Sequence, residues 1–297
     1  KCLHYSHPLS SLLFYFQCPS RPTSIVIMPM KEDFITFIQE EQFQFWFALV
    51  PLAYIFFVVL FRLLGWWPEK ARKGSRLSDI MSYEIIAGFI VTYVGVAGTY
   101  GWIEMWNNPE SEFHPLQFNR FYGRSQFFVD HLMIPMFSYQ VWNVVLCFVL
   151  SDLFEPFFIG HHTVTATLAF FGTNPYVHYY GLFFFGIAEL TNVPLTFVDV
   201  FKYFPDMKAK YSIVNEVSRV IFALSFIILR LIVWPVISLE FWRESFKLVQ
   251  TGEAHNNFVV IFFLFANLFL TGLQFMWGSK IFGFLFKKPS KKQEKSA

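Results

Sequence analysis

Long apolar runs with almost no charge recur along this sequence and constrain its fold more than any other feature. Only 15% of the 297 residues are charged, against about 25% in a typical soluble globular protein. A helix needs about 20 apolar residues to cross a hydrocarbon core about 30 Å thick. The sequence therefore predicts an all-α, multi-pass transmembrane helical bundle. About seven spans are expected, at residues 43–64, 83–102, 127–150, 157–171, 176–197, 213–237 and 258–286.

Positive charge is distributed unequally among the segments that join these spans. It gathers after the first span, after the fifth span and in the C-terminal tail, at Lys70, Arg72, Lys73, Arg76, Lys202, Lys208, Lys210, Lys287, Lys288, Lys291, Lys292 and Lys295. With seven spans these segments lie on one side of the membrane, and the positive-inside rule makes that side cytosolic. The loops on the other side, around residues 110–124 and 240–257, are mixed or acidic.

The chain divides into four parts by composition. Residues 1–42 form an N-terminal segment, of which residues 1–27 are interpreted as a gene-model extension because Met28 and Met30 precede the first charged, helix-like stretch. Residues 43–74 hold the first span and its basic loop, residues 75–286 form the main domain, and residues 287–297 form a Lys-rich cytosolic tail. The net charge of +2 gives no reason to expect a nucleic-acid partner.

Two adjacent histidines, His161 and His162, interrupt the fourth apolar run. An ionisable side chain inside a bilayer costs roughly 2.5–3.5 kcal/mol on insertion scales, so such groups usually face a cavity, pair with one another or do chemistry. Neighbouring positions on a helix differ by about 100°, so the two rings point in different directions. Catalysis or substrate binding, structural hydrogen bonding and metal binding all stay open for the pair. Helical metal ligands prefer a spacing of four residues, so no metal site is predicted.

Further polar residues interrupt the later spans. Glu189 and Asn192 are three residues apart and share a helix face, and Pro194 is expected to kink the helix near Leu190. Arg230 lies deep in the sixth span, where it needs a carboxylate partner. Glu189 or Asp152 could supply one. Asn267 and Gln274 share a face of the last span, so spans three to seven are predicted to line a polar-walled cavity in an aromatic shell.

These motifs, in this order, resemble a TLC domain, the lipid-handling membrane fold of ceramide synthases, translocon-associated proteins and TLC-domain-containing proteins. The resemblance covers roughly residues 75–286. It rests on five elements: Asp152 after an apolar helix, the pair His161-His162, the stretch Glu189-x-Thr191-Asn192-x-Pro194, Arg230 with Pro235, and the run Leu273-Gln274-Phe275-Met276-Trp277. Ceramide synthases carry a His-Asp…Asp element where this chain has Ala188-Glu189-Leu190-Thr191. The closer likeness is therefore to the TLC-domain-containing branch.

The resemblance implies a protein that binds lipid or acyl chains and influences membrane lipid composition. The alternative is an acyl-CoA-dependent lipid N- or O-acyltransferase, for which acyl-CoA would be a co-substrate and no other cofactor is expected. The candidate catalytic residues are His161, His162 and Asp152, and the candidate substrate-binding residues are Glu189, Asn192, Arg230, Gln274 and Trp277. Membrane lipids are the expected partners, and self-association stays open. The endoplasmic reticulum is the expected location, with the plasma membrane as the alternative.

Overall fold

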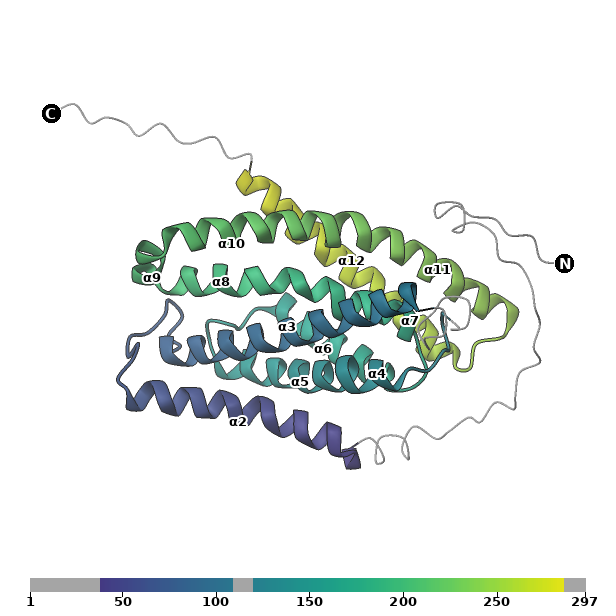
Figure 1. The fold of residues 1–297 in the computed structure, drawn as a ribbon, viewed down its shortest axis with the longest axis horizontal. Helices are drawn as coiled ribbons and strands as arrows, with labels where there is room; N and C mark the ends of the chain where they lie inside the picture. The colour runs from purple at the N-terminus through teal and green to yellow at the C-terminus, as the bar shows by residue number, and fades with distance from the viewer. Residues whose placement is uncertain (1–37, 109–119, 286–297) are drawn as a thin grey trace.

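The chain folds into a bundle of long helices that run between the same two ends (Figure 1). The computed structural model describes residues 38–108 and 120–285, so the predicted extension at 1–27 and the tail at 287–297 lie outside the described residues. The described helical elements, in chain order, are α2 (Glu41–Leu63), α3 (Leu77–Asn107), α4 (Gln126–Phe128), η1 (Val129–Met133), α5 (Ile134–Val149), α6 (Pro156–Phe171), α7 (His178–Gly181), η2 (Leu182–Gly186), η3 (Ile187–Thr191), α8 (Asn192–Tyr203), α9 (Pro205–Lys210), α10 (Ser212–Ser225), η4 (Phe226–Val233), α11 (Trp234–Thr251) and α12 (Asn257–Leu285).

Six helices of the described part are long and apolar enough to cross a membrane. They are Glu41–Leu63, Leu77–Asn107, Gln126–Val149, His178–Tyr203, Ser212–Thr251 and Asn257–Gly283. The remaining predicted span is α6, which has 16 residues and is about 24 Å long at 1.5 Å per residue. The predicted all-α, multi-pass bundle is therefore confirmed, and α6 is its short member.

Contacts between loops identify the two ends of the bundle. At one end, the Trp67 ring lies 5.2 Å from the Phe204 ring, and the Asp152 carboxylate accepts hydrogen bonds from the α2–α3 loop. At the other end, the Val177 backbone N–H donates to the Phe121 carbonyl at 2.7 Å, and the His255 N–H donates to the Tyr122 hydroxyl at 3.0 Å. Because α6 begins just after Asp152 and ends just before Val177, it runs the whole way between these ends despite its length.

Helix α6 has clear start signals in the sequence. Glu155 caps the first turn by accepting a hydrogen bond from the Phe158 N–H at 3.0 Å, and Pro156 occupies the first helical position, where its missing N–H costs nothing. The helix packs antiparallel against α5, and its first turns carry His161 and His162. The two histidines are thus fixed by a well-capped helix whose other side is exposed, for example at Phe157.

Two glycines allow α3 to approach the irregular segment η2 very closely. A Cβ atom added to Gly98 would lie 2.4 Å from the Gly186 Cα, and one added to Gly186 would lie 2.5 Å from the Gly98 Cα. Real Cβ contacts are never this short, so both positions require glycine unless the backbones move apart. This contact holds η2, and with it the start of the candidate site, against the centre of the bundle.

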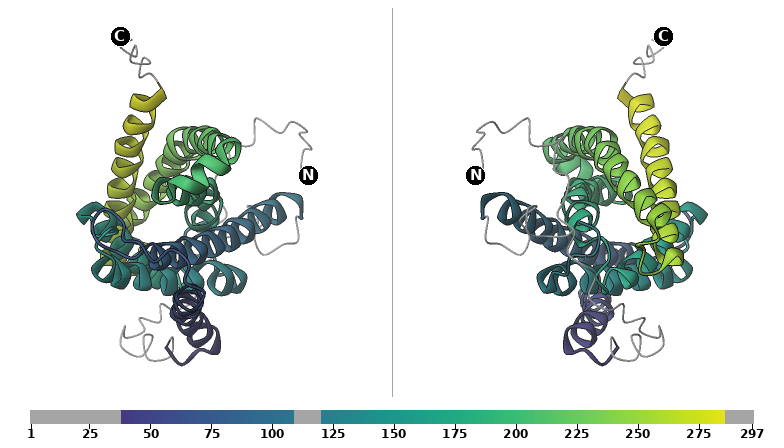
Figure 2. Two further views of the ribbon diagram at one scale, coloured as in Figure 1. Left: turned by 90° about the vertical axis from the view of Figure 1, so that its left-hand side faces the viewer. Right: turned by 90° about the vertical axis from the view of Figure 1, so that its right-hand side faces the viewer.

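The sixth span is longer than the sequence pattern predicted. The interpretation of residues 240–257 as a loop is wrong for its first part, because α11 continues to Thr251. The reason is amphipathic spacing: Trp234, Ser238, Phe241 and Ser245 are buried at intervals of four, three and four residues, while the charged residues lie on the other face. Figure 1 shows α10 and α11 forming one continuous rod, and Figure 2 shows α12 at the edge of the bundle.

Candidate functional site

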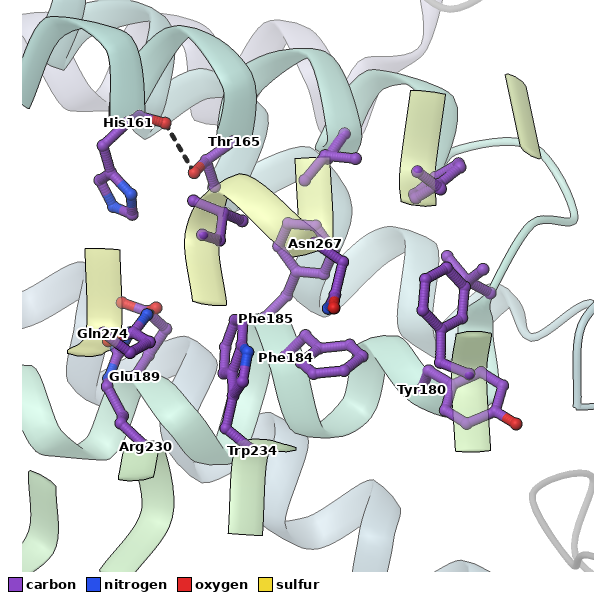
Figure 3. Close-up of a pocket in the computed structure, with 15 residues that line it drawn as sticks. His161, Thr165, Tyr180, Phe184, Phe185, Glu189, Arg230, Trp234, Asn267 and Gln274 are labelled. Atoms are coloured by element: carbon purple, nitrogen blue, oxygen red, sulfur yellow. Dashed lines mark hydrogen bonds and ion pairs between the residues drawn. The ribbon is translucent and has the colours of Figure 1, made fainter. Parts of the chain in front are cut away.

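A narrow cavity lies between α6, the η2–η3 segment, the η4–α11 segment and α12. Its free volume is about 40 Å³. Figure 3 shows a polar end, formed by His161, Gln274, Glu189 and Arg230, and an aromatic continuation through Phe184 towards Tyr180. Its lining on α12 extends from Phe263 to Gln274, which is about 16 Å along the helix at 1.5 Å per residue. Half of a hydrocarbon core about 30 Å thick has a similar length.

Arg230 organises the polar end of this cavity. Its Nη2 lies 3.2 Å from the Glu189 Oε1 and donates to the Ala188 carbonyl at 2.9 Å, while its Nε donates to the Thr191 hydroxyl at 2.8 Å. The second Glu189 oxygen accepts from the Asn192 Nδ2 at 2.6 Å. The Arg230 and Glu189 side chains are only 5% and 12% exposed. The expected carboxylate partner of Arg230 is therefore Glu189, and the pair presents no net charge to the cavity.

The backbone of this region is irregular, as the sequence predicted around Leu190. Pro194 has no N–H to bond the Leu190 carbonyl, and the preceding residues form a π-helical turn followed by a 3-10 turn. In this irregular segment the Ala188 carbonyl accepts hydrogen bonds from two side chains, the Thr191 hydroxyl and the Arg230 guanidinium, each at 2.9 Å. Arg230 itself lies on the π-helical turn η4, which ends two residues before Pro235. Such π-helical turns are frequent at functional sites.

The two histidines point in different directions, in agreement with their adjacent positions. The His162 Nδ1 hydrogen-bonds the Gln140 Oε1 on α5, so this ring joins two helices. His161 points into the cavity, and its Nδ1 has no hydrogen-bond partner in the described structure. The His161 and Trp277 rings pack in a T-shaped arrangement, with centroids 5.6 Å apart. His161 is therefore held by packing while its polar atoms stay available.

Gln274 is the second polar side chain of the cavity without a partner. It is 1% exposed, it lines the cavity, and neither its Nε2 nor its Oε1 has a hydrogen-bond partner among the described residues. A buried polar group without a hydrogen bond costs about 1–3 kcal/mol. The amide of Gln274 and the imidazole of His161 thus form a small polar site at one end of a channel that is lined mostly by aromatic and aliphatic side chains.

A family model described as the TLC domain matches residues 85–283, well over half of the chain. The protein belongs to the TLC domain family. No curated protein matches the chain. The matched range contains every residue that lines the cavity, so the cavity lies within the TLC domain of this chain.

The TLC domain brings some of the predicted site residues together and leaves others apart. His161, Glu189, Arg230 and Gln274 line the cavity. Two more predicted residues, Asn192 and Trp277, touch the lining residues Glu189 and His161. His162 instead binds α5.

Asp152 lies at the end of the bundle, away from the histidines of the TLC domain. Its two carboxylate oxygens accept hydrogen bonds from the backbone N–H groups of Lys73 and Ser75, each at 3.0 Å. Asp152 was a candidate catalytic residue, but both of its oxygens bind the α2–α3 loop and neither binds a histidine. Asp152 therefore joins the α2–α3 loop to the segment that precedes α6.

Two polar partners in the TLC domain were absent from the predicted site. Gln140 binds His162, and Thr191 binds Arg230. Thr191 lies inside the Glu189–Pro194 motif and could have been chosen for that reason. Gln140 is an amide inside an apolar span, and buried amides in such spans often form interhelical hydrogen bonds. Within residues 38–108 and 120–285, no three metal-ligating side chains come together.

Proposed function

We propose that this protein binds a membrane lipid or its acyl chain in the cavity beside His161 and thereby influences membrane lipid composition. The observation that carries the proposal is the pair of unpartnered polar side chains, His161 and Gln274, at one end of a mostly apolar channel. A hydroxyl, ester or amide of the lipid would satisfy them, and the chain would extend towards Tyr180. Because Arg230 is neutralised by Glu189, the site favours an uncharged polar group over a phosphate.

The lining must move for a chain to enter, because the free volume is only about 40 Å³. The π-helical turns η2 and η4 border the cavity and contain Phe184, Phe185 and Arg230. Their backbones already depart from the regular α-helix, so adjustment there breaks fewer regular hydrogen bonds than elsewhere. Family membership agrees with a role in lipid biology.

The second candidate function is acyl transfer, and the free imidazole of His161 favours it. A neutral His161 would take the proton from a lipid amine or hydroxyl as that group attacks the thioester carbonyl of acyl-CoA. The carbon–sulfur bond then breaks, and the thiolate leaves and takes up the proton. The products are an amide or ester and free coenzyme A. Asp152 has no part in this scheme, since both its oxygens are engaged elsewhere.

Replacing His161 by Ala is expected to abolish the protein's effect on cellular lipids while leaving its abundance unchanged. His161 makes no side-chain hydrogen bond through Nδ1, so its loss leaves no partner unpaired. Quantitative lipidomics of cells lacking the protein and resupplied with each variant measures the effect. Thr163→Ala is the matched control, because Thr163 lies on the same helix and is exposed.

In the same experiment, His162→Ala shows the effect of losing a histidine that supports the fold and does not line the cavity. It should reduce abundance, because the Oε1 of the buried Gln140 loses its partner at a cost of about 1–3 kcal/mol. Purified protein that makes no labelled product from labelled acyl-CoA with sphingoid bases or lysolipids would exclude those acyl transfers. A fully active His161→Ala protein would contradict the whole proposal.

The orientation and location are also proposed, with the C-terminal tail in the cytosol and the protein in the endoplasmic reticulum. The loops that carry Lys70, Arg76 and Lys208 lie at one end of the bundle, as the positive-inside argument requires. Protease added to sealed microsomes, cytosolic face outward, should remove a tag placed after Ala297. Protection of the tag from the protease would show that the C-terminus lies on the lumenal side, which contradicts the proposed orientation.

A further inference from the structure

A short segment covers the far end of the His161 cavity, which is the end opposite His161 and Gln274. It consists of residues 120–122, which form a turn before α4 and are called the latch below. The cavity lining at this end includes Val177, Tyr180 and Phe241, and Figure 3 shows Tyr180 there. The latch contacts two of these residues directly, as the ring of Phe121 and its carbonyl show.

Phe121 is the inner part of the latch. It is only 3% exposed, and its ring stacks on the Phe241 ring with centroids 6.1 Å apart and planes 6° apart. The Phe241 ring in turn packs against the Tyr180 ring in a T-shaped arrangement, with centroids 5.4 Å apart. The Phe121 carbonyl accepts a hydrogen bond from the Val177 backbone N–H at 2.7 Å. Phe121 therefore plugs the far end of the cavity beneath the protein surface.

Arg120 is the outer part of the latch and binds it to α11. Its Nη1 lies 3.6 Å from both the Glu240 Oε2 and the Glu244 Oε1, and its guanidinium carbon lies 5.2 Å from the centre of the Tyr179 ring. Both ion-pair distances exceed those of ordinary hydrogen bonds, and the three charged side chains are 33–36% exposed. Ion pairs of this kind are weak because water screens them, so Arg120 can leave α11 at little cost.

Two groups beneath the latch are held in unfavourable states while it is closed. Val177 has a φ of 56°, in the left-handed region, where the branched side chain of valine strains the backbone. The Tyr180 hydroxyl is fully buried beside Glu244 but has no hydrogen-bond partner of normal geometry among the described residues. Movement of the latch would release Val177 and let water reach this hydroxyl. Backbone strain of this kind is found at ligand clamps and switch regions.

We propose that the latch is the gate of the His161 cavity. Release of Arg120 from Glu240 and Glu244 lets Phe121 move away from Phe241, which opens the far end. The inference deepens the proposed function, because a cavity of about 40 Å³ must widen before a chain enters it. An opening at this end suits a ligand whose polar group stays at His161 while the end of its chain passes the latch.

The reactivity of a cysteine placed inside the cavity tests the gate without any bound lipid. Leu168 is 5% exposed and lines the cavity, so Leu168→Cys in the full chain in nanodiscs should react slowly with charged methanethiosulfonate reagents. Protein without this change gives the background from natural cysteines such as Cys147. Adding Arg120→Gln should speed the reaction about tenfold, the equivalent of about 1.4 kcal/mol. The negatively and the positively charged reagent should both react faster.

Three further variants separate opening of the latch from other effects. Arg120→Lys keeps a positive charge beside α11 and should keep the slow rate. Arg243→Gln is the matched control, because Arg243 lies on α11, is exposed and takes part in none of the ion pairs of the described residues. Phe121→Ala leaves Arg120 in place but removes the plug, so it should also speed the reaction. Size-exclusion chromatography checks that each variant is folded.

Two results would overturn the inference. Unchanged rates in both Arg120→Gln and Phe121→Ala would show that the cavity does not open at this end. Equal acceleration by Arg243→Gln, or acceleration of one reagent alone, would show that charge acts on the reagent and not on a gate. If Arg120→Gln does not fold, Phe121→Ala and the double variant Glu240→Gln/Glu244→Gln decide the matter. His161→Ala should leave all rates unchanged, which separates this outcome from any failure of the lipid site at His161.

Discussion

Arg230→Met is expected to destabilise the protein by about 3–5 kcal/mol, because it removes one partner of a buried ion pair and leaves the other charge uncompensated. Glu189 is 12% exposed on its side chain and would lose its only cationic neighbour among the described ion pairs. The Ala188 carbonyl and the Thr191 hydroxyl would lose hydrogen bonds as well. Thermal unfolding of the detergent-purified protein, followed by the loss of its monodisperse chromatographic peak, measures the effect.

Arg219→Met is the matched control for this prediction. Arg219 lies in the same rod, 11 residues before Arg230, and pairs with Glu216 at 3.1 Å, but the two side chains are 50% and 62% exposed. An exposed pair of this kind contributes at most about 1 kcal/mol. Adding Glu189→Gln to Arg230→Met should restore part of the lost stability, since the uncompensated charge is gone. Equal effects of Arg230→Met and Arg219→Met would show that Glu189 needs no partner.

The polar part of the candidate site was largely predictable because polar side chains are costly in a bilayer. Arg230 had to find a carboxylate, and Glu189 and Asn192 had to share a face, so their contacts follow from residue type and helical spacing. The different directions of His161 and His162 follow from their adjacent positions in the same way. These predictions needed no knowledge of how the helices are arranged.

The choice between partners on different helices was not predictable. Asp152 and Glu189 were equal candidates for Arg230 until the bundle placed Asp152 at the α2–α3 loop. Gln140 could be paired with His162 only once α5 and α6 were known to pack together. The π-helical turns depend on local backbone geometry beyond the hydrophobic pattern, and the Gly98–Gly186 contact joins residues far apart in the sequence.

Identification of the bound lipid tests the central claim, that the cavity beside His161 holds a lipid. Wild-type protein purified in mild detergent should retain a lipid that native mass spectrometry detects as a discrete added mass. Leu270→Trp places a larger side chain in the cavity, where Leu270 is 6% exposed, and should remove most of that signal. The cost of overpacking is about 1–3 kcal/mol, so stability is measured in parallel.

Leu268→Trp is the control for this measurement, because Leu268 lies on the same helix, is 54% exposed and does not line the cavity. Wild-type and Leu268→Trp protein should carry the same lipid, and folded Leu270→Trp protein should carry little or none. The same bound mass in all three proteins, or no bound lipid in the wild type, would contradict the central claim.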